Sequence, residues 1–164
     1  FVLELDGDQE NAVVLNIFGG KITTYRHLAE AALGKLGPWL SKMKRPWTRG
    51  VPLPGGDFPI DGVRDLKGKI ELEYGALPSD LRDRLVCTYG TRTIRLLGDA
   101  ATPDDLGQHF GAGLYQREVE HLIENEWAQT VEDILWRRSK LGLRMKSQEV
   151  TTLAAWLRVR LEGD

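Results

Sequence analysis

The sequence predicts a mainly α protein: a helical domain of about five to seven helices, preceded by a β-hairpin and one further helix. Three observations carry this prediction. Residues 1–18 are rich in strand-forming residues around a stretch of turn residues, whereas apolar residues beyond position 62 recur at helical spacing. A hydrophobic content of 41% in 164 residues is enough for the core of one ordinary domain.

Composition narrows the class of protein. A net charge of −2 at pH 7 gives no overall attraction to nucleic acid. The single cysteine, Cys87, excludes an internal disulfide framework and fits a reducing compartment such as the cytoplasm. Cys87 falls in a predicted helix and has no partner, so we expect it to be a small buried hydrophobe. The chain has no apolar run of the roughly 18 residues needed to span a bilayer.

The predicted hairpin joins residues 1–6 and 12–18 through the turn residues 7–11. Its second strand is apolar at nearly every position, which is typical of a strand covered on both faces. A two-stranded ribbon cannot supply that cover. We therefore expect the chain to have been cut from a longer protein, and the hairpin either to be disordered or to pair with another copy of the chain.

A helix follows Gly19-Gly20, capped by Thr23 or Thr24 and ended by Gly37-Pro38. Its predicted apolar stripe is Tyr25, Leu28, Ala29, Ala32 and Leu36. Residues 38–61 are rich in proline and glycine and read as a connector, which we expect Trp39, Trp47 and Phe58 to hold in place.

The remaining residues form the predicted helical domain. Its helices span residues 62–74, 79–89 with Ser79 as the cap, 91–97, 116–127, 130–141 with Thr130 and Asp133 as a capping box, and a last helix from Ser147 with the stripe Val150, Leu153, Ala154, Leu157 and Leu161. A helix start is also predicted at residues 102–105, with Thr102 as the N-cap, Pro103 at the first helical position and two aspartates in the first turn, and residues 107–114 read as a glycine-rich loop.

Most of the motifs that carry chemistry elsewhere are missing. Gly20-Lys21 is not a nucleotide-binding P-loop, because Leu15 and Ile22 stand where that motif requires a glycine and a hydroxyl residue. The turn is either a simple connection with a solvated lysine or a place where main chain approaches a flat or anionic group. His121 and Glu124 share a helix face, but no second pair of ligands joins them, so we predict a solvated pair and no metal site.

Two basic regions allow more than one interpretation. Around Trp127 and Trp136 we favour an aromatic core with ion pairs of Asp133 to Arg137 and Arg138; the alternative is a cationic surface for an anion or a partner. For the last helix we favour a solvated face over a membrane-binding one. Its relevant residues are Arg144, Lys146, Trp156, Arg158 and Arg160.

Six stretches occur together in an order that is typical of one family. They are NIFGGKITTYR at 16–26, PLPGGD at 52–57, Tyr89-Gly90, Asp105-Leu-Gly107, Glu126-Trp127 and LWRRSKLG at 135–142. With them the chain resembles the C-terminal part of FAD-dependent (aerobic) glycerol-3-phosphate dehydrogenase and alpha-glycerophosphate oxidase. The resemblance implies that residues 1–37 end an FAD-binding domain, 38–61 are a connector, and 62–164 form a helical C-terminal domain.

The resemblance also implies a site at the Gly19-Gly20 turn. Phe18, Gly19, Gly20 and Lys21 would run along the flavin, and Thr23 and Thr24 would each cap the helix or donate to a ring oxygen. Lys21 would be the catalytic residue, facing either flavin or substrate, with Arg26 as a weaker candidate. A helix N-terminus and an ammonium group both stabilise the negative charge that a flavin gains on reduction.

The implied function belongs to a longer parent protein. That parent would oxidise sn-glycerol 3-phosphate to dihydroxyacetone phosphate with FAD as hydride acceptor, and pass electrons to quinone, or to O₂ in the oxidase variant. It would be cytoplasmic and peripheral on the inner face of the membrane. This chain would pack on the N-terminal FAD and substrate domains and be inactive alone. The rival hypothesis is an independent helical interaction module that needs no flavin.

Overall fold

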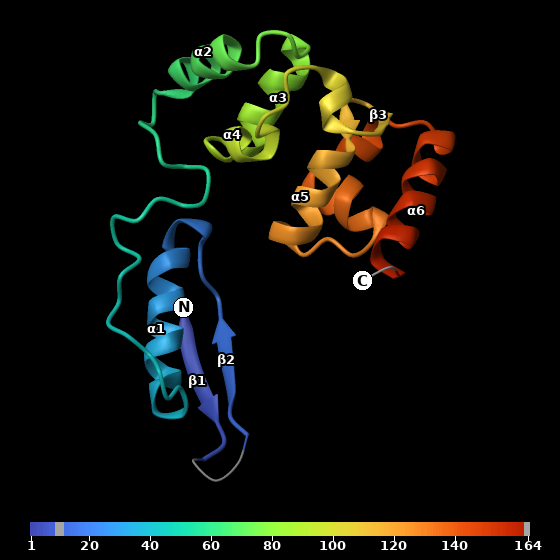
Figure 1. Cartoon of the computed structure of the whole chain (residues 1–164). Coiled ribbons are helices and arrows are strands. Elements are labelled where there is room, and N and C mark those ends of the chain that lie inside the picture. Colours follow the sequence, from blue (N-terminus) through green and yellow to red (C-terminus); the bar gives the residue numbers. More distant parts are fainter. Residues whose placement is uncertain (9–11, 163–164) are drawn as a thin grey trace. The chain divides into compact units, whose positions relative to one another are not determined.

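The computed structural model describes residues 1–8 and 12–162 and divides into two compact units, Phe1–Val51 and Pro52–Asp164 (Figure 1). The division falls within residues 38–61, the stretch rich in proline and glycine. Helices make up most of the regular structure, which confirms the predicted mainly α class.

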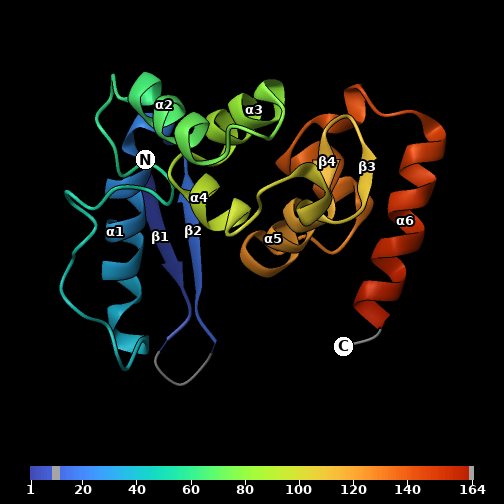
Figure 2. The ribbon, with the colours of Figure 1, turned by 45° about the horizontal axis from the view of Figure 1, so that its top comes forward.

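The first unit consists of a hairpin and a helix. Strands β1 (Val2–Asp6) and β2 (Val14–Phe18) pair antiparallel, with Val2 opposite Phe18 and Asp6 opposite Val14. Helix α1 (Tyr25–Leu36) lies beside the hairpin in Figures 1 and 2. The predicted hairpin and helix are therefore confirmed, although residues 9–11 of the predicted turn lie outside the described residues.

The described residues of the first unit form no buried core of their own. Among its described residues none is fully buried, and Leu3, Leu5 and Leu15 are only half-buried. Val14 and Phe18 are exposed, with 53% of Phe18 accessible to solvent. Because one layer of helix on a two-stranded sheet covers only one of its faces, the other face is left open, and on it Val14 and Phe18 lie among polar residues such as Asp6.

The aromatic residues of the connector differ in burial. Trp39 is half-buried and donates from Nε1 to the main-chain oxygen of Asp8 at 3.3 Å. Phe58 packs against the core of the second unit. Trp47 is exposed, so the prediction that it holds the connector in place was wrong.

Two glycines let the segment after Pro52 cross the turn between α3 (Ser79–Tyr89) and α4 (Arg92–Leu97) at close range. Gly55 and Gly90 both have positive φ, of 84° and 55°. A Cβ built on Gly90 would overlap the main-chain oxygen of Gly55. The same oxygen accepts a hydrogen bond from the main-chain nitrogen of Thr91 at 3.0 Å. The Thr91 hydroxyl donates to the carboxylate of Asp57.

The second unit is helical and has a single apolar core. Helix α2 (Val63–Glu73) packs against α3, while α5 (Gln116–Glu126) packs against α4. Ser79 is the first residue of α3 and its hydroxyl makes no capping bond; Pro78 stands in the capping position, so the predicted Ser79 cap was wrong. The innermost side chains are Phe110, Ile70, Leu77, Leu85, Leu97, Leu114, Leu122, Ile134, Leu135 and Leu153.

The predicted glycine-rich loop contains a small hairpin that the sequence did not reveal. Strands β3 (His109–Gly111) and β4 (Leu114–Tyr115) pair antiparallel around a tight turn (Figure 2). Strands of three and two residues are too short to show an alternating pattern. The turn is held by three successive residues with positive φ, Gly111, Ala112 and Gly113.

Helix α6 (Ser147–Glu162) packs on β3 and completes the core. Leu153 and Leu157 are buried, and Trp156 lies edge-on to Phe110 with ring centroids 5.5 Å apart. Ala154 and Leu161 of the predicted stripe are exposed instead, because this helix rests on the core along a narrow line. Over residues 1–8 and 12–162, no helix is long and apolar enough to cross a membrane.

The predicted helix at 130–141 is shorter and wound differently. It forms a π-helical segment at Asp133–Arg138. Ser139 follows its last residue, and both the main-chain nitrogen (3.1 Å) and the hydroxyl (2.6 Å) of Ser139 donate to the oxygen of Ile134, five residues back. Lys140 then takes a positive φ of 60° and a 3-10 turn follows at Leu141–Leu143.

The capping box of this segment is confirmed. Asp133 accepts hydrogen bonds from the main-chain nitrogens of Gln129 and Thr130, both at 3.0 Å, and its own nitrogen donates to the Thr130 hydroxyl at 3.1 Å. The predicted ion pairs are also present, from Asp133 to Arg137 at 3.0 Å and to Arg138 at 3.3 Å.

The two tryptophans near this segment do not form the predicted aromatic core. Trp127 ends α5 with a positive φ of 55° and is 83% exposed. Trp136 is also exposed. The left-handed backbone at Trp127 turns its side chain away from the apolar face of α5. Arg138 donates to the main-chain oxygen of the preceding residue, Glu126, at 2.8 Å.

Asp133 makes stability depend on pH in the acid range. The hydrogen bond from Gln129, and then those from Thr130 and the charge of Arg137, lower the pKa of Asp133 from 3.8 to about 2. A carboxyl group whose pKa is lower in the folded state stabilises the fold above its unfolded pKa, and that contribution is lost as the pH falls. We expect Asp133→Asn to be less stable than wild type at pH 7, with the difference shrinking between pH 3.8 and 2. Urea unfolding across this range checks it; a difference independent of pH would contradict it.

Candidate functional site

The turn that follows β2 has a backbone that only glycine adopts easily. The strand ends at Phe18, and Gly19 and Gly20 have φ of 74° and 121°. Side chains other than glycine rarely take such angles. Both glycines are exposed, so their main-chain groups are open to close approach.

Lys21 directly follows this turn, and its backbone is extended, with φ −124° and ψ 149°. A 3-10 turn at Ile22–Thr24 follows directly and leads into α1. Thr24 and Lys21 are joined by hydrogen bonds across this 3-10 turn. The main-chain nitrogen and the hydroxyl of Thr24 both donate to the main-chain oxygen of Lys21 at 2.9 Å. The Lys21 nitrogen lies 3.4 Å from the same hydroxyl oxygen.

The side chains of the turn point to solvent. Lys21 and Thr23 are exposed, Phe18 is half exposed and Ile22 is 86% exposed. Within the described part of the chain, no carboxylate forms an ion pair with the Lys21 ammonium. The turn therefore presents a cation beside apolar surface and uncovered main chain.

Arg26, the weaker candidate, is already engaged. Its Nη1 pairs with Glu30 at 3.1 Å and donates to the Thr48 hydroxyl at 3.4 Å. Thr48 in turn donates to Glu30, and this bond, with the charge of Arg26, lowers the pKa of the Glu30 carboxyl. Arg26 thus holds α1 to the connector and is separated in role from Lys21.

The second unit contains a buried ion pair that was not predicted from the sequence. Glu118 of α5 is only 2% exposed. Arg84 of α3 donates to its two carboxylate oxygens at 2.7 and 2.6 Å, and Tyr89 donates to it at 2.8 Å. Arg84 also donates to the oxygen of Gly113 at 2.7 Å, which ties the β3–β4 turn to both helices.

This network shifts the ionisation of its members. Burial opposes the charge of Arg84, but the hydrogen bonds and charge of Glu118 raise the pKa of Arg84 above its ordinary value. Burial, and then the charge of Glu118, raises the pKa of Tyr89 well above its ordinary value. The arginine therefore stays charged and the phenol stays protonated, which suits a structural pair.

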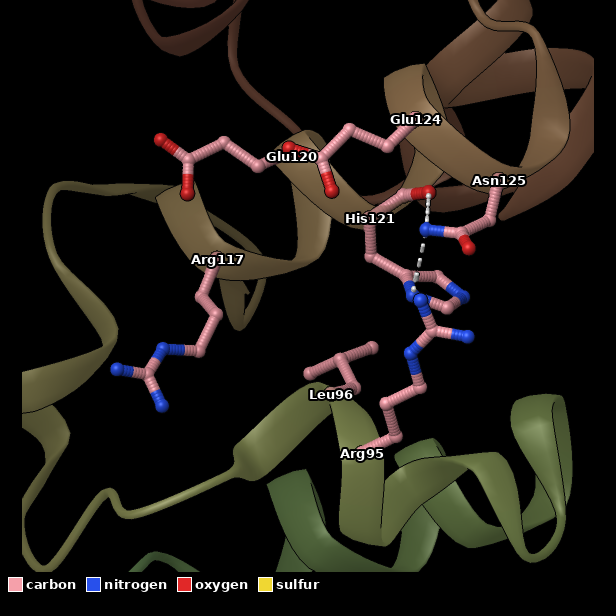
Figure 3. A pocket seen from close by; sticks show the side chains of 7 residues that line it. All are labelled: Arg95, Leu96, Arg117, Glu120, His121, Glu124 and Asn125. Carbon is pink, nitrogen blue, oxygen red and sulfur yellow. Dashed lines mark hydrogen bonds between the residues drawn. The ribbon is translucent and has the colours of Figure 1, made fainter.

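A polar cavity of about 230 Å³ lies between α4 and α5 (Figure 3). Its lining includes Arg95, Arg117, Glu120 and Glu124, whose charges balance, and Figure 3 shows them spread along the two helices. Arg117 is also paired outward with Asp99 at 3.1 Å. An even mixture of charges gives this cavity no preference for a cation or an anion.

His121 lies at the inner wall of this cavity and is 7% exposed, so the predicted solvated pair with Glu124 was wrong. It sits on the apolar face of α5, edge-on to Tyr89 with ring centroids 5.3 Å apart. Asn125 donates toward its Nδ1 at 3.4 Å (Figure 3), while Nε2 is buried without a partner among the described residues.

Burial lowers the pKa of His121, with Arg92 and Arg95 acting in the same direction against Glu126, so the ring is neutral. No group of three or more possible metal ligands occurs in residues 1–8 and 12–162.

Cys87, the remaining reactive side chain, is exposed on α3, so the prediction of a buried hydrophobe was wrong. Leu85 and Val86 fill the core side of that turn of the helix. The face that Cys87 occupies carries polar neighbours and points away from the core.

Comparison with known proteins extends over both units. Residues 46–159 match the family model of the C-terminal domain of alpha-glycerophosphate oxidase. A glycerol-3-phosphate dehydrogenase of Pseudomonas aeruginosa is 44% identical over 157 residues, which are 96% of this chain and 30% of that protein.

Two further relatives share a similar extent. The aerobic glycerol-3-phosphate dehydrogenase of Escherichia coli is 37% identical over 96% of this chain and 31% of its own length. A D-erythritol 1-phosphate dehydrogenase of Brucella abortus is 36% identical over 95% of this chain and 31% of its own length. The chain therefore spans somewhat less than a third of these curated relatives.

Proposed function

Because the chain belongs to the family of the alpha-glycerophosphate oxidase C-terminal domain, we propose that it completes an FAD-dependent oxidoreductase. The names of the relatives specify glycerol 3-phosphate and D-erythritol 1-phosphate, which are both polyol monophosphates. The proposed reaction of the whole protein is oxidation of sn-glycerol 3-phosphate to dihydroxyacetone phosphate.

The observation that carries this proposal is the exposed cation at the Gly19-Gly20 turn. Without Cβ atoms the two glycines leave room for a flat ring, and the half-exposed Phe18 offers apolar surface beside it. These features fit a flavin, for which the holding residues would be Phe18, Gly19, Gly20 and Lys21, with one hydroxyl of the turn, that of Thr23 or of Thr24, as a donor. When bound there, FAD would accept the hydride from C2 of glycerol 3-phosphate.

The proposed role of Lys21 is electrostatic. An ammonium group in a site closed to water stabilises negative charge strongly, because the surrounding dielectric is low. The first main-chain N–H groups of the helix beyond Lys21 act in the same direction. Lys21 would serve either the charge that develops on the ring system or the phosphate and hydroxyls of the substrate.

The rest of the chain would support this site. We propose that residues 1–37 end the FAD-binding domain, residues 38–61 connect, and residues 62–164 form a helical domain that packs on the FAD and substrate domains of the same polypeptide. The chain alone would then bind little FAD and show no turnover. Its uncovered hairpin face would make it prone to self-association.

The proposal extends to the electron acceptor of the whole protein. Quinone is the proposed acceptor, for a cytoplasmic protein that sits peripherally on the inner face of the membrane. The oxidase variant would use O₂ instead. Assaying the whole protein with a soluble quinone and with O₂ as sole acceptors separates the two.

Replacing Lys21 by alanine in the whole protein tests the site. We expect turnover of glycerol 3-phosphate to fall by about 100-fold, the size of effect seen when one stabilising charge or donor is removed from an active site. Flavin content should be retained, and the flavin reduction potential should change if Lys21 faces the ring. Lys35→Ala, which removes an exposed lysine from α1, is the matched control. Unchanged turnover in Lys21→Ala would mean that the turn only connects two elements.

A further inference from the structure

We propose that Thr24 is a positioning residue that fixes the direction of Lys21 and does not itself contact the flavin. This inference rests on the function proposed for Lys21. It separates Thr24 from its neighbour Thr23, although both residues have the same side chain and occupy the same turn.

The hydroxyl of Thr24 is engaged within the protein. A threonine hydroxyl has a single proton to donate. In Thr24 that proton is used on the main-chain oxygen of Lys21, at 2.9 Å. The hydroxyl therefore has no proton left for a carbonyl oxygen of a ring system. Its lone pair faces the main-chain nitrogen of Lys21 at 3.4 Å.

Thr23 differs in this respect. Its side chain is exposed, and within the described residues its hydroxyl takes part in no hydrogen bond. If a hydroxyl of this turn donates to a ligand, the donor is Thr23. The two threonines thus divide the roles that the sequence left open between them.

The backbone before Lys21 has more conformational freedom than the backbone after it. Two glycines precede it, and glycine restricts the backbone least of all residues. The Lys21 backbone is therefore held mainly from the side that follows, by the ring of bonds to Thr24. Losing the hydroxyl leaves one main-chain bond, from the Thr24 nitrogen, to hold the extended conformation of Lys21.

The test is a double-mutant cycle of Lys21 and Thr24 in the whole flavin-loaded protein. We expect Thr24→Val to lower kcat about tenfold with flavin content unchanged, because a misplaced catalytic group loses most of its effect. Thr24→Ser keeps the hydroxyl and should restore kcat to within about twofold. In the Lys21→Ala background, Thr24→Val should cause no further loss, since residues that act as a unit are not additive.

Thr151→Val is the matched control. It makes the same change at an exposed hydroxyl that donates to a main-chain oxygen, that of Ser147 at 3.0 Å, in α6. We expect its kcat to equal that of wild type. If Thr24→Val does not accumulate as folded protein, Thr24→Ala removes the same hydroxyl with less bulk and replaces it in the cycle.

Each other outcome has a distinct meaning. An equal loss from Thr24→Val with and without Lys21 would show that Thr24 acts by itself, which overturns the inference. Loss of flavin in Thr24→Val would make it a cofactor contact, with the same consequence. Wild-type kcat in Thr24→Val beside a slow Lys21→Ala would overturn the positioning role alone. Wild-type kcat in Lys21→Ala would overturn the proposed function of Lys21, whatever Thr24→Val does.

Discussion

Replacing Arg84 by methionine is expected to lower the free energy of unfolding by about 3–5 kcal/mol, which is the usual cost of removing one partner from a buried ion pair. Methionine keeps most of the volume of the arginine stem. It leaves the carboxylate of Glu118, 2% exposed, with only the hydroxyl of Tyr89 as a donor. It also leaves the oxygen of Gly113 without its bond to Arg84.

A second substitution shows whether charge is the cause. Arg84→Met combined with Glu118→Gln removes both charges, so the double variant should be more stable than Arg84→Met alone. Lys67→Met is the control, because Lys67 pairs with Asp83 at 3.1 Å on the surface and should cost less than about 1 kcal/mol. Urea unfolding followed by circular dichroism measures all three. Equal losses in Arg84→Met and Lys67→Met would show that the buried pair contributes no more than a surface pair.

Replacing Gly90 by alanine is the second large effect that we expect, at about 3 kcal/mol or more. The new Cβ would overlap the main-chain oxygen of Gly55, and the positive φ of Gly90, 55°, is unfavourable for alanine in itself. Since the overlap is with main chain, no side-chain rotation relieves it. The segment at Gly55 must move away, and the hydrogen bond from Thr91 to Gly55 is lost with it.

Gly68→Ala is the matched control for Gly90→Ala. Gly68 lies inside α2, and a Cβ there meets nothing within 4 Å. Alanine in a helix interior should stabilise the protein by about 0.5–1 kcal/mol relative to glycine. Opposite signs for the two substitutions in urea unfolding are the expected result. A stability of Gly90→Ala equal to that of Gly68→Ala would mean that the two segments do not touch.

Local patterns predicted the elements of this fold well, and distant contacts poorly. The Thr130–Asp133 capping box could be predicted because both partners lie within four residues, and it formed as expected. The ion pair of Arg84 and Glu118 joins residues 34 positions apart, so no local pattern shows it. One signal was available: Glu118 and His121 share the face of α5 that carries Leu122, and polar residues on an apolar face call for partners.

The candidate site could be named from sequence because its residues are consecutive, from Phe18 to Thr24. What remained open was the use of each side chain. The engagement of Arg26 by Glu30 and Thr48 depends on the path of the connector, which proline and glycine content does not determine. The predicted burial of Trp127 and Trp136 was wrong because it rested on the size of the side chains alone. The left-handed backbone at Trp127 directs that side chain outward.

The absence of buried residues in the described part of the first unit has a consequence for assembly. A segment that cannot bury enough surface by itself gains its final rigidity from whatever it binds, and the cost of ordering it falls on that step. The second unit, with its own core, needs no such help. In the proposed enzyme, Lys21 would then be held firmly only after the neighbouring domains have docked. Its electrostatic effect on the reaction would then depend on correct assembly, so a protein whose domains have not yet docked would not catalyse redox chemistry in a site exposed to solvent.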